Sequence, residues 1–229
     1  MLKLIRLEWK KNRIGKDVRN AVILALCLGF FVYSVEFFGI TDEIPEANSI
    51  GISAFIELLT NMSFIVFCGA MLASYIVGAY KNKTMNLMFS YPIKRQKILA
   101  SQMIAVWSFN FIALTLTKLL IYLCVFMGAK FMPSSFTIDF CIGSLSFYIQ
   151  LILKSVVIVS MSFIALFVGI AMKSSKATVL TSFLLIFLTQ ANVGDFTISN
   201  NAIFPVILTV ISFGFAGLSI YNAERNDLI

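Results

Sequence analysis

The sequence contains no histidine, and only 13% of its residues are charged. Histidine is the commonest general base, the usual partner of serine and cysteine nucleophiles, and a main zinc ligand. We therefore expect neither catalytic residues nor a metal site in this chain, and we expect it not to be an enzyme. Typical soluble domains are about 25% charged, so a soluble protein fits this composition poorly.

Cysteine is scarce too, and the four cysteines show no paired spacing. Neither a disulfide framework nor a cysteine-based zinc site is therefore indicated. Basic residues outnumber acidic ones, 18 to 11, which gives a net charge of +7. Such an excess can indicate nucleic-acid binding. Here, however, the basic residues flank apolar segments, and we expect no nucleic-acid partner.

Apolar residues make up 59% of the chain. They gather in six segments, each near the ~20 residues that cross the hydrocarbon core of a bilayer. We predict an all-α polytopic membrane protein, a single transmembrane domain over residues 1–229. Its spans are expected at about 21–40, 54–79, 99–127, 146–172, 178–193 and 201–221. On the second span, Ala70, Ser74 and Gly78 repeat at four-residue spacing, which lets helix backbones approach closely.

Residues 1–20 are predicted to form a basic amphipathic helix that lies on the membrane surface. Side chains of each kind recur at helical spacing. The basic stripe consists of Lys3, Arg6, Lys10 and Arg13, and the apolar stripe beside it of Leu2, Ile5 and Trp9. We expect Trp9 at the level of the lipid headgroups. A solvated basic tail is the alternative.

The distribution of lysine and arginine predicts the orientation of the chain. Fifteen of the 18 fall in the N-terminal segment, the 80–98 loop, the 173–177 turn and the C-terminal segment, whereas only Lys130 falls on the opposite side. Loops rich in lysine and arginine stay in the cytoplasm. We therefore expect a multi-pass protein of the cell membrane with both termini in the cytoplasm.

The loop from Tyr80 to Gln102 is polar and carries a run of positive charges. Thr84 can cap a short helix over residues 85–90, because its hydroxyl can accept from an unpaired backbone N–H. Pro92 then ends that helix. Met85, Met88 and Phe89 fall on one of its faces. A short cytoplasmic helix with an exposed apolar face is typical of a docking surface.

The sequence of this loop resembles a known family. Thr84, Leu87, Ser90, Pro92, Arg95 and Ile98 are arranged as in the loop between the second and third transmembrane helices of ABC-2 type transporter permeases. The likeness is greatest to small Gram-positive permeases of the peptide and bacteriocin export or immunity class. With the hydropathy plan, the resemblance covers nearly the whole chain. Lys83 stands where the family usually has glycine, and Ala79 where it usually has an acid.

The resemblance implies a function and partners. In that family the loop is the coupling helix, which docks on a separate ATPase subunit. The implied contact residues are Thr84, Met85, Leu87, Met88, Phe89, Pro92 and Arg95. Two such permeases, identical or similar, would assemble with two ATPase subunits in the lipid membrane. The implied activity is export of an amphipathic or antimicrobial peptide, or of another lipophilic compound.

ATP and Mg²⁺ would then be bound by the ATPase subunit, and this chain itself would need no cofactor. The fragment from Gly78 to Thr84 approaches the spacing of a phosphate-binding loop. It lacks the second glycine before the lysine, and it follows a membrane span rather than a strand. A phosphate cradle needs both features. We therefore expect no ATPase motif in this chain.

Four charged residues fall inside the expected spans: Glu57, Lys118 and Lys154, together with Glu36 near an outer end. A charge at the bilayer centre costs about 2.5–3.5 kcal/mol on insertion scales. One interpretation is a substrate path or intramembrane charge cluster in which Glu57 meets at least one lysine. The other is a structural ion pair with lysines that reach toward the headgroups. Two other functions also stay open: a peptide-binding immunity or sensor protein that transports nothing, and a secondary transporter that uses Glu57.

Overall fold

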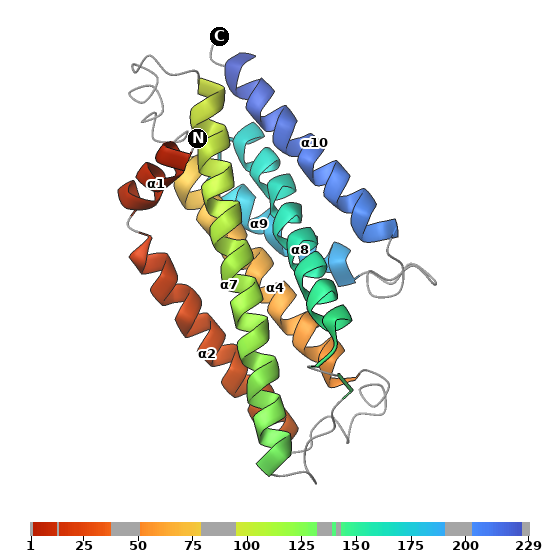
Figure 1. The fold of residues 1–229 in the computed structure, drawn as a ribbon. Helices are drawn as coiled ribbons and strands as arrows, with labels where there is room; N and C mark the ends of the chain where they lie inside the picture. Colours follow the sequence, from red (N-terminus) through yellow and green to blue (C-terminus); the bar gives the residue numbers. More distant parts are fainter. Residues whose placement is uncertain are drawn as a thin grey trace. The chain divides into compact units, whose positions relative to one another are not determined.

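The computed structural model describes residues 2–12, 14–37, 51–78, 95–131, 139–140, 143–190 and 203–225. All regular elements in these ranges are helices (Figure 1). They are α1 (Leu2–Lys11), α2 (Gly15–Phe37), α4 (Ile52–Leu72), the π-helical turn η2 (Ala73–Val77), α7 (Arg95–Phe131), α8 (Leu145–Ala171), α9 (Ser175–Gln190) and α10 (Ile203–Arg225). The expected all-α class is confirmed for the described part of the chain.

Four stretches of helix are long and apolar enough to cross a membrane. They are Gly15–Phe37, Ile52–Val77, Gln96–Lys130 and Leu145–Ala171. The shortest has 23 residues, which at ~1.5 Å per residue matches the ~30 Å hydrocarbon core. Two shorter apolar segments, Ser175–Phe187 and Val206–Ile220, lie in α9 and α10. These findings indicate a membrane protein.

The N-terminal helix that we expected on the membrane surface is shorter than predicted. α1 ends at Lys11, and residues 15–20 belong to α2 rather than to the surface helix. The backbone N–H of Ile14 donates to the carbonyl of Trp9 at 3.1 Å. A hydrogen bond that spans five residues in this way is typical of a helix terminus. Asn12 and Gly15 flank this break, and both residue types disfavour the helix interior.

The chain divides into two compact units, and the division falls within α4, α7 and α8. The first unit comprises Met1–Ile14, Ser63–Phe111 and Val156–Ile229, and the second comprises Gly15–Met62 and Ile112–Ser155.

In the first unit, α1 is attached to α7 by two hydrogen bonds. The indole Nε1–H of Trp9 donates to the carbonyl of Ala105 at 3.2 Å. The amide Nε2 of Gln102 donates to Glu8 Oε1 at 3.3 Å. Trp9, expected at the headgroups, therefore has a protein partner for its N–H. This contact fixes α1 against the N-terminal part of α7.

Small residues let α9 pack closely against α4 in the same unit. A Cβ built on Gly69 would lie 1.8 Å from Ser182 Oγ and 2.7 Å from its Cβ, so only glycine fits at this contact. The hydroxyl of Ser175 donates to the carbonyl of Ala73 at 3.4 Å, where η2 begins. Close backbone approach through small residues is the main source of helix association in lipid.

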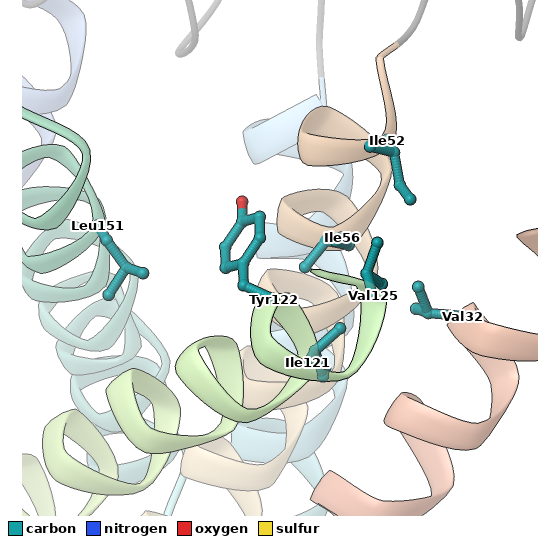
Figure 2. Close-up of a cluster of buried hydrophobic side chains, with 7 residues drawn as sticks. All are labelled: Val32, Ile52, Ile56, Ile121, Tyr122, Val125 and Leu151. Atoms are coloured by element: carbon teal, nitrogen blue, oxygen red, sulfur yellow. The ribbon is translucent and has the colours of Figure 1, made fainter. Parts of the chain in front are cut away.

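The second unit has one apolar core, formed by α2, α4, α7 and α8 (Figure 2). The ring of Tyr122 on α7 lies between Leu151 of α8 and Ile56 of α4 (Figure 2). Phe140 and Phe147 pack edge-on against this ring, with centroids 4.8 and 4.9 Å away. This core brings together the three helices that carry the ionisable residues of the candidate site.

Candidate functional site

One hydrogen bond sets the register between α4 and α7 in the second unit. The Tyr122 hydroxyl donates to the carbonyl of Ser53 at 3.3 Å. Residues four apart lie on one face of a helix. Glu57 therefore shares the face of Ser53, and Lys118 shares the face of Tyr122. The hydrogen bond thus places Glu57 and Lys118 on facing sides of the two helices, each one turn away from the contact between Tyr122 and Ser53.

The first turn of α4 is held by Asp139. Its carboxylate accepts from the backbone N–H of Ser53 at 3.2 Å (Oδ1) and from the Ser53 hydroxyl at 2.7 Å (Oδ2). A carboxylate at this position satisfies a helix N–H that has no intrahelical acceptor, and it opposes the positive end of the helix dipole. Gly51 leaves room for this carboxylate, since a Cβ there would lie 1.9 Å from Asp139 Oδ2. Asp139 thereby fixes the end of α4 that carries Glu57.

Glu57 and Lys154 form an ion pair between α4 and α8. Lys154 Nζ lies 2.6 Å from Glu57 Oε2. The side chain of Lys154 is 31% exposed and that of Glu57 is 21% exposed, so neither is fully withdrawn from the surface of the protein. The contact that the sequence led us to expect between Glu57 and at least one lysine is present. Whether this pair serves a substrate path stays a prediction.

Lys118 is the unusual member of the cluster, because its side chain is 0% exposed. Its Nζ has no hydrogen-bond partner within the described ranges. Glu57 and Lys154 both act on it electrostatically, the first favourably and the second unfavourably. The amide oxygen of Asn61, one turn beyond Glu57, is likewise buried without a partner among those residues. One buried donor and one buried acceptor are therefore left without described partners in this unit.

The cluster of Glu57, Lys118 and Lys154 contains two cations and one carboxylate. With Glu57 held by Lys154, a positive charge is left on Lys118 among apolar helices. Such an arrangement can attract water or an anionic group. It contains no nucleophile activated by a base. Among the described residues, no group of three or more His, Cys, Asp or Glu side chains could hold a metal ion.

Most of the other predicted site residues lie outside the described part of the chain, wholly or in their side chains. Thr84, Met85, Leu87, Met88, Phe89 and Pro92 fall between residues 79 and 94, which the structure does not describe. Arg95 is described only as the first residue of α7. Of the basic stripe, Lys10 is exposed on α1, whereas Arg13 and the side chains of Lys3 and Arg6 are not described.

Two residues of this site were not predicted from the sequence. Asp139 lies in a loop, where nothing in the sequence connects it to the start of α4. In the sequence, Tyr122 is one residue of an apolar segment, although it lies four residues after Lys118. The sequence signal that could have identified Tyr122 is its position four residues from a charged residue in a predicted span.

The chain resembles a protein of Bacillus subtilis (strain 168) that is described as "Uncharacterized protein YcbO". The two are 26% identical over 237 residues, which cover 99% of this chain and 100% of the relative. No family model matches the chain, and no solved structure matches it. The likeness thus extends over the full length of both proteins, and it brings no activity to this chain.

Proposed function

We propose that this chain is the transmembrane permease subunit of an ATP-binding cassette exporter. The observation that carries the proposal is the charge cluster, in which α4, α7 and α8 each bring an ionisable side chain to one place. Charged residues in membrane helices are costly, and they mark substrate or ion pathways. Lys118 in particular bears this cost without a described partner. In a permease, such a site can form part of the substrate path.

The resemblance of residues 84–98 to a coupling loop supports a connection to an ATPase. That loop would join the π-helical end of α4 to the start of α7. Helices α9 and α10 would complete a set of six spans, with both termini in the cytoplasm. Two permease copies, or this chain and a paralogue, would assemble with two ATPase subunits that bind ATP and Mg²⁺. The substrate would be an amphipathic or antimicrobial peptide, or a lipophilic compound.

Copurification tests this proposal. The tagged chain, extracted gently from its native membrane, is expected to retain an ATPase subunit. The Phe89→Asp variant is expected to lose that subunit, because an unpaired carboxylate in an apolar groove costs several kcal/mol. Met172→Asp is the matched control, since Met172 is 64% exposed in the turn between α8 and α9. Equal ATPase retention by both variants would contradict docking through the face of Phe89.

The ion pair of Glu57 also favours a second candidate, a secondary transporter in which this carboxylate carries a proton or pairs with a cation. The two candidates differ in their energy source. Transport that collapses with a protonophore while cellular ATP is unchanged would favour the secondary transporter. Transport that stops on ATP depletion at constant proton gradient would favour the exporter.

A further inference from the structure

An open groove with one cationic end lies between α4–η2 and α9 in the first unit. Its volume is about 740 Å³, and its walls include Ala70, Ser74 and Gly78 on one side and Leu180 and Phe183 on the other. This volume lies within the range of ligand pockets, roughly 300–1,000 Å³. Ala70 and Ser74 are exposed. The small-residue stripe predicted from the sequence therefore forms a wall of this groove, and the close helix contact is made beside it by Gly69.

The cationic end of the groove is Lys176. Lys173, two residues after the end of α8, has a φ of 48°. The N–H of Ser174 then donates to the carbonyl of Gly169, which completes a common helix stop. This turn fixes the start of α9 and hence the position of Lys176. Among the described residues, no carboxylate pairs with Lys176.

Charge and hydropathy change along the groove in the order found in a phospholipid. Lys176 lies in the first turn of α9, and Phe183 lies seven residues further on, about 10 Å along the helix. Because α9 opens at the turn after a candidate spanning helix, a membrane crossed by that helix would have its headgroup phosphates near Lys176. Leu180 and Phe183 would then lie at the depth of the acyl chains.

We propose that this groove binds one anionic phospholipid, with the headgroup at Lys176 and an acyl chain along Leu180 and Phe183. Among the described residues, no acidic side chain lines the groove, so its charge complements an anionic lipid better than a zwitterionic one. A basic residue near the membrane surface attracts anionic lipid. The site is independent of what the chain transports and of whether an ATPase binds it.

Quenching of a tryptophan probe by brominated lipids tests the site in the full-length chain, reconstituted in vesicles. The probe is Leu180→Trp, in a background where Trp9 and Trp107 are changed to Phe. Leu218→Trp is the matched control, because Leu218 is 49% exposed on α10 and does not line the groove. Quenching is compared between brominated phosphatidylglycerol and brominated phosphatidylcholine at equal mole fraction.

At Leu180→Trp we expect phosphatidylglycerol to bind about fivefold more strongly than phosphatidylcholine, and Lys176→Gln to abolish this preference. At Leu218→Trp we expect no preference. An equal ratio at the two positions would overturn the proposal, as would a preference that survives Lys176→Gln. The proposal would also be overturned if neither brominated lipid quenched the tryptophan of Leu180→Trp while both quenched the tryptophan of the control. A protein segment would then cover the groove.

A second measurement needs no tryptophan probe and keeps Trp9 and Trp107 in place. It therefore tests the site even if the variant with both tryptophans changed to Phe does not fold. Native mass spectrometry of the detergent-purified chain counts the lipids retained after addition of phosphatidylglycerol or phosphatidylcholine. We expect the unchanged chain and the Lys173→Gln variant to retain one phosphatidylglycerol per chain, and the Lys176→Gln variant to retain none. Lys173 is exposed and lies outside the groove. Equal retention by the two variants would contradict the site.

Discussion

The carboxylate of Glu57 on α4 lies 2.6 Å from the ammonium of Lys154 on α8. The two residues are 97 positions apart in the sequence, and each lies in a helix apolar enough to cross a membrane. Lys118 of α7 is fully buried and lies within electrostatic reach of both. Glu57 thus lies within electrostatic reach of two cations, and of these two only Lys154 is hydrogen-bonded to it.

The first prediction concerns the energetic coupling of this pair. Glu57→Gln leaves Lys154 without its counter-charge, whereas Glu57→Gln combined with Lys154→Met leaves neither charge. We expect the double variant to be more stable than the sum of the single effects indicates, with a coupling energy of about 1–3 kcal/mol. Unfolding in detergent, measured for the four proteins of the cycle, gives this value. Strict additivity would show that the ion pair does not form.

The second prediction concerns Lys118. Because its ammonium is buried without a described partner, Lys118→Met is expected to stabilise the protein by about 1–3 kcal/mol. Methionine keeps the length of the side chain and removes its charge. Lys130→Met, at an exposed position on the same helix, is the control and is expected to change stability by less than about 0.5 kcal/mol.

A transport assay of the same variants distinguishes the two interpretations of Lys118. If the charge belongs to a substrate path, Lys118→Met loses transport although it is more stable. Unchanged transport in a stabilised variant would leave Lys118 without a role in the path. Loss of stability in Lys118→Met would show that the ammonium has a favourable partner in the folded protein.

The third prediction concerns the start of α4. Asp139→Ala removes the acceptor of the Ser53 N–H and is expected to cost about 1 kcal/mol. Gly51→Ala is expected to have a similar effect, because its Cβ would displace the same carboxylate. The two changes together should cost little more than either alone. Hydrogen exchange in the first turn of α4 measures each effect, and fully additive losses would contradict the shared cause.

The sequence predicted the helical class and the positions of the four long apolar helices, because hydropathy over ~20 residues is a strong local signal. It also indicated that Glu57 meets a lysine, because insertion in lipid makes isolated charges costly. It did not indicate which lysine would be hydrogen-bonded. That depends on the rotation of α7 and α8 about their axes, which is set by packing around Tyr122 and Leu151 rather than by local pattern.

The N-terminal helix was predicted too long for a related reason. Basic residues continue through Lys16 and Arg19, so the charge pattern alone predicted one helical segment where the structure has two helices. The break at residues 12–14 is determined by backbone hydrogen bonds at the end of α1. The docking of Trp9 on Ala105 is a long-range contact that no helical periodicity encodes.

The central claim is that this chain works with an ATPase that docks on its 84–95 loop. A photo-crosslinking amino acid placed at Phe89 in living cells tests that contact directly, with the same amino acid at Ser49, in the loop expected outside, as the control. We expect the crosslinker at Phe89 to capture a nucleotide-binding ATPase subunit and the crosslinker at Ser49 to capture none. Capture of no ATPase at Phe89, in a variant that reaches the membrane in normal amount, would contradict it.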